Sequence, residues 1–301
     1  MRWEGQAVRA KLVLLSVWER TMSSRFERFA LYLTVPAGLL VILLYALPIL
    51  QVLALSLTEG SGALANYERL FTSRAVSRVV QTTLVVSIST TAITMVIAYV
   101  IAFGMIHMSD RQRKVALLMV SIPFWVSVLV RAFAWITILR SQGLLNSGLM
   151  SIGAITEPIQ MVYNRTGVTI GMVHYMVPFA VLLLYANLTD IDRRVIQAAR
   201  SLGARPMTVF LKVWLPMSLP GISVASLFIF VFSLGFLITP ALLGGGRTLM
   251  IAEYISVQIS NTGRWDLATS LSTALLLVVG VLLAFALRSP AMRVAFGGSV
   301  K

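Results

Sequence analysis

Long apolar runs, separated by short polar segments, dominate the sequence. A helix that crosses a bilayer needs roughly 20 mainly apolar residues. The runs of this chain therefore predict an all-α, polytopic membrane protein with six transmembrane helices. These helices are expected at about 30–57, 79–106, 115–139, 166–187, 221–243 and 265–287.

The composition agrees with this pattern. Hydrophobic residues make up 58% of the chain and charged residues only 12%, whereas soluble domains carry about 25% charged residues. The mean hydropathy of +0.87 indicates the same class. The chain has no cysteine and only two histidines, His107 and His174. Disulfides and zinc–thiolate sites are therefore excluded, and we expect no metal site.

The basic residues predict the orientation. A net charge of +14 would suggest nucleic acid in a soluble protein, but Lys and Arg of membrane proteins collect in cytoplasmic loops. We therefore expect contact with lipid and not with nucleic acid. With the N-terminus in the cytoplasm, 17 basic residues lie on that side, 7 lie opposite and Arg131 lies within a span. We expect cytoplasmic tails at 1–28, which includes the short apolar run 13–18, and at 291–301, around a transmembrane domain of residues 29–290.

The segment 190–216, between the fourth and fifth spans, is polar and basic. Asp190 and Asp192 can cap a helix over about 193–202, Gly203 suits the left-handed position after it, and Pro206 suits the first turn of a second helix. One interpretation is a helix pair that lies on anionic lipid. The other is a docking element for a soluble partner, because small residues allow close backbone approach. The expected apolar faces are Val195, Ala199 and Leu202 in the first helix and Met207, Phe210, Leu211 and Trp214 in the second.

The spacing in this segment resembles the cytoplasmic signature of permease subunits of binding-protein-dependent ABC importers: EAA, three residues, G, nine residues, I, one residue, LP. Here Gln197-Ala198-Ala199 is followed at the same spacing by Gly203, Val213 and Leu215-Pro216. Gln197 stands for Glu and lacks its charge, and Val213 stands for Ile. The resemblance implies a coupling helix that docks on the ATPase. The residues that it assigns to coupling are Gln197, Ala198, Ala199, Gly203, Ala204, Pro206, Leu215 and Pro216.

Three further stretches, 131–147, 167–179 and 236–251, resemble the spermidine/putrescine branch of these permeases, so the likeness covers roughly residues 30–290. It implies the type I ABC importer fold, a location in the bacterial inner membrane, and transport by alternating access. The implied partners are an ABC ATPase dimer, a second homologous permease chain, with a heterodimer expected, and an external solute-binding protein. The implied solute is a polyamine or related cation. Iron, amino-acid-like and phosphonate compounds are alternatives.

The chain offers no chemistry of its own for ATP. None of its four lysines follows a glycine, as a phosphate-binding loop would require. We therefore expect no catalytic residue and no cofactor in this chain, with ATP and Mg²⁺ used by the partner ATPase. An ion-coupled secondary transporter is the rival class. Such proteins place acidic or histidine relays within spans, but none of the 11 acids here lies deep in a predicted span.

Candidates for the solute pathway are few. Arg131 lies in mid-span, where a lipid-facing charge is costly, so it either ties the bundle together or contacts the solute. His174 is expected to form an interhelical hydrogen bond, with a proton relay as the alternative. Acidic and aromatic residues near the outer ends could attract a cation, or could be ordinary residues of the membrane interface. The candidates for the pathway are Arg131, Trp135, Glu157, Tyr175, Glu253 and Tyr254.

Overall fold

The computed structural model describes residue 32, residues 34–60 and residues 62–288. The expected tails at 1–28 and 291–301 lie outside the described residues. By packing, the chain divides into two units, Met1–Leu55 and Ser56–Lys301. The described part of the first unit belongs to the helix Thr34–Thr58, whose apolar side chains are exposed.

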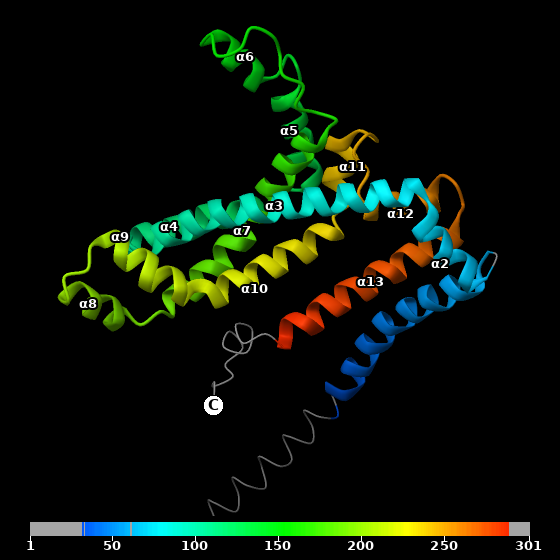
Figure 1. The fold of residues 1–301 in the computed structure, drawn as a ribbon, viewed down its shortest axis with the longest axis horizontal. Helices are drawn as coiled ribbons and strands as arrows, with labels where there is room; N and C mark the ends of the chain where they lie inside the picture. The colour runs from blue at the N-terminus through cyan, green and yellow to red at the C-terminus, as the bar shows by residue number, and fades with distance from the viewer. Residues whose placement is uncertain (1–31, 33, 61, 289–301) are drawn as a thin grey trace, which may run out of the picture. The chain divides into compact units, whose positions relative to one another are not determined.

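The second unit consists of helices joined by short loops (Figure 1). No strand occurs among residues 34–60 and 62–288, so the predicted all-α class is confirmed for the described chain. A 3₁₀ turn at Ile122–Trp125 and a π turn at Phe210–Trp214 interrupt the α-helices. The α-helices are α2 (Ala63–Thr72), α3 (Arg74–Ile106), α4 (Asp110–Ser121), α5 (Val128–Leu139), α6 (Leu144–Ser151), α7 (Arg165–Thr189), α8 (Arg193–Ser201), α9 (Pro206–Val209), α10 (Leu215–Leu234), α11 (Ile238–Gly244), α12 (Ile251–Ser260) and α13 (Trp265–Arg288).

The predicted number of membrane spans is confirmed. Six helical segments of the described chain are long and apolar enough to cross a bilayer. The first, second, fourth and sixth agree closely with the predicted ranges, whereas the third and fifth differ. The six segments are Thr34–Thr58, Arg74–Ile106, Val128–Ser151, Arg165–Thr189, Pro206–Leu234 and Trp265–Arg288.

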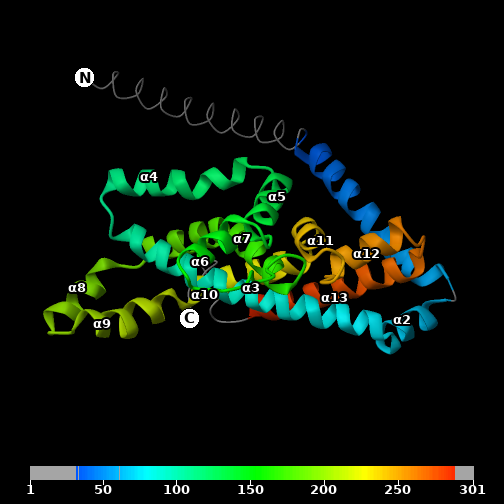
Figure 2. The same cartoon turned by 90° about the horizontal axis from the view of Figure 1, so that it is seen from above.

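The third predicted helix, 115–139, is wrong as a single helix. It is divided into the end of α4, the 3₁₀ turn and α5, which begins at Val128. Pro123 explains the break, because its missing backbone N–H removes a hydrogen bond of the α-helix. The helix tightens into the 3₁₀ turn, and the chain becomes extended at Val126. The direction of the chain therefore changes between α4 and α5 (Figure 2).

The fifth predicted helix, 221–243, has the wrong ends. The helical segment runs from Pro206 to Leu234, and α11 is a separate helix after Gly235. Pro216 and Pro220 therefore lie inside it. Membrane helices tolerate proline where neighbouring helices or local π geometry satisfy the freed backbone groups, and here the π turn lies immediately before α10. The second helix of the 190–216 hairpin is thus continuous with the fifth span.

Small side chains bring the central helices together. Ala98 and Ala102 of α3 and Ala180 of α7 are fully buried, as is typical of packing between membrane helices. The helix α10 lies against both. At Gly221 an added Cβ would lie 2.1 Å from the Asn187 side chain of α7. The glycine therefore sets the close approach of α10 to α7.

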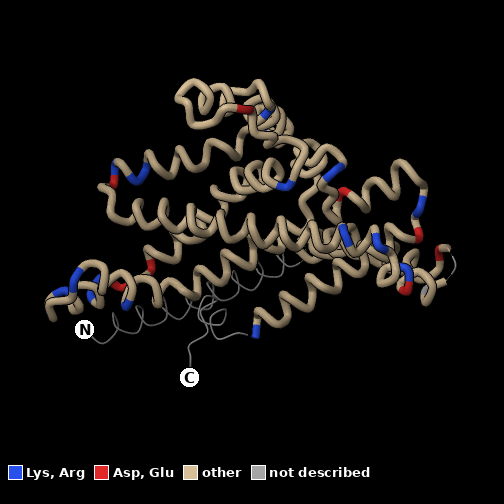
Figure 3. The backbone as a smooth tube through the Cα atoms, turned by 45° about the horizontal axis from the view of Figure 1, so that its top comes forward, with Lys and Arg blue, Asp and Glu red and all other residues tan. Residues whose placement is uncertain are grey.

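The two ends of the second unit differ in their basic residues. The hairpin α8–α9 and the turn from α3 to α4 lie at one end, and α2 and α12 lie at the other (Figures 1 and 2). Lys and Arg gather on the hairpin and at the start of α4 (Figure 3). At the opposite end, Thr83 of α3 accepts a hydrogen bond from the backbone N–H of Ile251 in α12 at 2.9 Å. This bond ties α12 to the central helices.

Candidate functional site

The hairpin α8–α9 is held by local hydrogen bonds. The Asp192 carboxylate accepts from the backbone N–H of Arg194 at 2.8 Å and caps α8. Gly203 has a φ of +80°. Its N–H donates to the Arg200 carbonyl at 2.9 Å, and the Ala204 N–H donates to the Ala199 carbonyl at 3.2 Å. These two bonds form a Schellman motif, which favours glycine at this position. The predicted helix, turn and proline-started second helix are confirmed.

The predicted apolar faces of the hairpin are right only in part. Trp214 is buried as predicted, and Ala199 and Phe210 are half-buried against the core. The predicted Val195, Leu202, Met207 and Leu211 are exposed, and the inward-pointing Ile196 and Val209 were not predicted. In the second helix the π turn adds a residue to the helical repeat and so rotates the buried face. In α8 the inward side lies at Ile196, and Leu202 already follows the last helical turn.

Exposed side chains form the outer surface of the hairpin. Leu202 is 89% exposed and Met207 is 67% exposed. Of the predicted coupling residues, Gln197, Ala198, Gly203, Pro206 and Pro216 are exposed, and Ala199, Ala204 and Leu215 are half-buried. Their local geometry fits a docking surface, and their role in coupling stays a prediction.

Aromatic rings fasten the hairpin to α3. The Phe103 ring lies 5.2 Å from Phe210 and 5.5 Å from Trp214, in edge-to-face geometry. His107 lies 5.9 Å from Trp214, and one more turn along α10 the hydroxyl groups of Tyr99 and Ser218 lie 3.0 Å apart. We call Phe103, His107, Phe210 and Trp214 the aromatic clamp. Sequence reasoning missed its α3 members, although Tyr99, Phe103 and His107 recur at the helical spacing of four.

Three of the predicted pathway residues come together between α5 and α7. The Arg131 guanidinium lies over the Tyr175 ring, 4.3 Å from its centroid. The Trp135 ring lies 5.5 Å from the His174 imidazole. The mid-span arginine therefore faces the interior of the bundle, as its charge predicts. The predicted interhelical hydrogen bond of His174 is wrong: its contact with α5 is the ring contact with Trp135.

The remaining pathway candidates lie elsewhere. Glu157 is exposed in the segment after α6, and Glu253 is buried in α12. Burial raises the pKa of Glu253 from 4.5 to about 7, although a hydrogen bond from the Met250 backbone lowers it. Tyr254 packs on a separate apolar cluster with Ile251 and Leu271. The structure does not bring these residues to Arg131.

An aromatic cluster extends from Tyr175 and was missed by sequence reasoning. Tyr175 lies 4.7 Å from Phe236 and 6.1 Å from Phe232. Phe179 lies 5.7 Å from Phe232 and 6.2 Å from Phe228. The spacing of four in both helices was the available signal. We call Tyr175, Phe179, Phe228, Phe232 and Phe236 the aromatic ladder.

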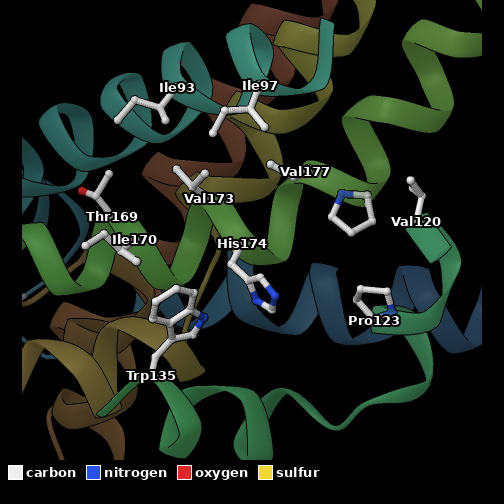
Figure 4. A pocket seen from close by; sticks show the side chains of 11 residues that line it. Ile93, Ile97, Val120, Pro123, Trp135, Thr169, Ile170, Val173, His174 and Val177 are labelled. Carbon is white, nitrogen blue, oxygen red and sulfur yellow. The ribbon is translucent and has the colours of Figure 1, made fainter. Parts of the chain in front are cut away.

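A cavity of about 500 Å³ lies beside Trp135 and His174 (Figure 4). It lies between α3, the α4–α5 break and α7, and its lining includes Ile97, Pro123 and Val173. Trp135 and His174 form its polar edge (Figure 4). Its apolar lining suits hydrocarbon rather than an ionic solute. Among the described residues, no group of three or more His, Asp and Glu side chains could hold a metal ion.

Comparison with known proteins gives a consistent set of relatives. No protein-family model matches the chain. It is 30% identical over 245 residues to the spermidine/putrescine transport system permease protein PotB of Haemophilus influenzae, covering 79% of this chain and 85% of that protein. The match to PotB of Salmonella typhimurium is 31% identical and covers 63% of this chain but only 66% of that protein, just under two thirds of its length. The inner membrane ABC transporter permease protein YdcU of Escherichia coli is 28% identical, with 75% of each chain covered.

Solved structures share the fold. A bacterial ABC transporter that imports the acidic polysaccharide alginate superposes with a TM-score of 0.69 at 20% identity, covering 89% of this chain and 96% of that chain. The methionine ABC transporter MetNI gives a TM-score of 0.53 at 18% identity, over 70% of this chain and 93% of that chain. At these identities the likeness shows the fold alone.

Proposed function

The chain belongs to the family of ABC importer permeases that includes PotB, and from that premise we propose that it forms half of the translocation pathway of an ATP-driven importer for a polyamine or related organic cation. The relatives named as spermidine/putrescine permeases support this solute class. The protein is a multi-pass membrane protein with six apolar spans among its described residues.

The outer surface of the hairpin is the observation that carries this proposal. Leu202 and Met207 are large apolar side chains exposed at the tip of a polar, basic segment. Ala198 and Gly203, also exposed, leave room for a partner's backbone. An apolar tip flanked by small residues is typical of a protein contact. A helix pair that lay on anionic lipid would require no such room. The partner in this proposal is the ATPase dimer, which binds the ATP and Mg²⁺.

The aromatic clamp and the continuous helix transmit motion in this account. The hairpin's second helix continues through the π turn into α10, and its Phe210 and Trp214 rings pack on Phe103 of α3. A movement of the hairpin therefore displaces α10 and the end of α3 together. This link suits alternating access, in which both helices move as the pathway changes sides.

The orientation follows from the basic residues. The hairpin and the start of α4 carry Arg111, Arg113, Lys114, Arg193, Arg194, Arg200, Arg205 and Lys212, and both lie at one end of the second unit (Figure 3). The positive-inside rule assigns that end to the cytoplasm of the bacterial inner membrane. Both termini are then cytoplasmic. An external solute-binding protein docks at the opposite end, and a second homologous chain, forming a heterodimer, supplies the other half of the pathway.

Leu202→Glu tests the docking surface. In the assembled complex this variant is expected to lower ATPase co-purification by roughly tenfold or more, because an uncompensated charge in a docked interface costs about 2–5 kcal/mol. Leu64→Glu is the matched control, since Leu64 is 87% exposed in α2 at the opposite end and Leu202 is 89% exposed. Co-purification and ATP-driven uptake that both survive Leu202→Glu would contradict the proposal.

A further inference from the structure

The aromatic ladder presents a row of ring faces from two helices. Tyr175 and Phe179 are one turn apart on α7, and Phe228 and Phe232 are one turn apart on α10. The Phe228 and Phe232 rings stack 5.8 Å apart and remain 42% and 37% exposed. Phe124, from the break between α4 and α5, extends the row to Phe179 at 4.7 Å.

The charge of Arg131 indicates what this row faces. A charged side chain at membrane depth faces a water-filled path or another protein chain rather than lipid. The Arg131 guanidinium lies on Tyr175, which also contacts Phe232 and Phe236. The ladder therefore belongs to the interior side of the bundle. Exposed rings on that side are available to a solute.

Arg131 occupies a cation site. Its guanidinium lies 4.3 Å from the Tyr175 centroid, well within the range of a cation–π contact. Its Nε is buried and has no hydrogen-bond partner. No described carboxylate forms an ion pair with it: the pairs of Arg69 and Arg264 with Asp266 and of Arg113 with Asp110 do not involve Arg131. Among the described residues, the face of the Tyr175 ring is thus the partner of the Arg131 charge. A cationic group of the solute could take the place of the guanidinium on that ring.

We propose that Arg131 is an internal cation that closes the aromatic ladder, and that the passing organic cation displaces it from Tyr175 and then moves along the rings. This deepens the proposed function and rests on it. With the hairpin end in the cytoplasm, Tyr175 and Phe236 form the outer rung of the ladder, and Phe179 and Phe228 lie further in. Arg131 therefore closes the ladder toward the outside. Its positive charge also repels an ammonium group until the bundle opens.

The ladder contains no carboxylate, and this favours the passage of a cation rather than its tight binding. Conduction requires a site favourable enough to enter and weak enough to leave. Each ring contact supplies a modest attraction, and an extended chain with several ammonium groups can exchange one ring for the next. A carboxylate ladder would hold such a solute far more tightly.

Uptake and leak of radiolabelled spermidine by the whole complex in proteoliposomes test the proposal. Tyr175→Leu is expected to lower uptake roughly two- to thirty-fold, the factor that one cation–π contact is worth, with Tyr175→Phe close to wild type. Arg131→Gln is expected to raise ATP-independent efflux of preloaded spermidine, and Arg131→Lys to restore the seal. A purely structural role for Arg131 would not raise this efflux. Phe133→Leu, at an exposed α5 ring without an aromatic contact, is the control.

The outcomes separate this proposal from the proposed function. A wild-type complex without ATP-driven uptake of spermidine overturns the polyamine part of the proposed function and, with it, this proposal. A wild-type complex with ATP-driven spermidine uptake, in which Tyr175→Leu and Arg131→Gln behave as Phe133→Leu does, leaves the proposed function standing and overturns the role of Arg131. Where Tyr175→Leu or Arg131→Gln reaches the membrane poorly, the conservative variants Tyr175→Phe and Arg131→Lys decide. If Tyr175→Phe also loses uptake and Arg131→Lys also leaks spermidine, the proposed role of Arg131 is overturned.

Discussion

The hairpin and the aromatic ladder are built in opposite ways. The hairpin is closed by bonds between near neighbours, such as the Ala204 N–H to the Ala199 carbonyl, and its tip is exposed. The ladder combines rings of α7 and α10, two helices that are separated in sequence by the whole hairpin. At one end of the ladder, the Arg131 guanidinium covers the Tyr175 ring. Docking on a soluble partner needs a local shape that is stable alone, whereas a pathway needs surfaces that move apart. The two regions are joined by α10 and the aromatic clamp, and by α7, which leads into α8.

Loss of the clamp should separate the two regions most strongly. Trp214→Ala removes a buried ring that contacts Phe103 and His107, at an expected cost of about 3 kcal/mol. ATPase co-purification should persist while spermidine uptake is lost, because the hairpin surface remains but no longer moves α3. Trp125→Ala, at a ring that is 91% exposed, is the control. Uptake at the wild-type rate in Trp214→Ala would break the link between the regions.

Crowding at Gly221 should loosen the packing of α10 on α7, the two helices that carry the ladder. Gly221→Leu places a side chain where Asn187 already lies, 2.1 Å from the position of the new Cβ. Overpacking of this kind costs about 1–3 kcal/mol, so the melting temperature of the purified complex should fall. Gly104→Leu in α3, where an added Cβ meets nothing within 4 Å, should leave it unchanged. Equal melting temperatures for both variants would show that α7 and α10 are not packed as described.

A backbone change should affect the hairpin alone. Gly203→Ala forces a left-handed φ of +80° on a residue with a Cβ, at about 1–2 kcal/mol, so ATPase co-purification should fall modestly. Gly62→Ala carries the same backbone penalty at a φ of +98° in equally open space before α2. If the two variants lower ATPase binding equally, the effect is not specific to the hairpin.

A pH dependence of stability is expected from a residue that lies in neither region. Burial raises the pKa of Glu253 from 4.5 to about 7, so the folded protein holds this proton more tightly than the unfolded chain. The resulting stability is present below pH 4.5 and is lost as the pH rises through 7. Glu253→Gln should therefore flatten the melting temperature between pH 5 and pH 8. An unchanged slope would contradict the assigned pKa.

The helices and the turn of the hairpin could be predicted from the sequence because the residues that determine them act locally. A capping aspartate, a glycine with positive φ and a proline in the first turn each act within a few residues, so Asp192, Gly203 and Pro206 predicted the turn and its helices. In the second helix the same reasoning found Phe210 and Trp214 but missed the buried Val209, because the π turn at Phe210–Trp214 has no clear signal in residue spacing. The number of spans followed from apolar length alone.

Of the candidate pathway, the sequence predicted Arg131, Trp135 and Tyr175, and only for Arg131 did it also predict the direction of the side chain. Arg131 had to face inward because lipid does not solvate a guanidinium, and the structure confirms its interior contact with Tyr175. Phe179, Phe228 and Phe232 were missed, because an aromatic ring on a membrane helix is equally compatible with lipid and with a pathway. Only the packing of α7 on α10 distinguishes the two.

The central claim is that the hairpin docks on the ATPase, and site-directed cross-linking tests it most directly. The chain has no cysteine, so Ala198→Cys and Leu64→Cys each create a single attachment point for a photoactivatable maleimide. In the assembled complex the account predicts that Ala198→Cys cross-links to the ATPase subunit, with a yield that changes when ATP is added, and that Leu64→Cys gives no ATPase product. Cross-linking of Ala198→Cys to lipid alone, or the same ATPase yield from both positions, would contradict it.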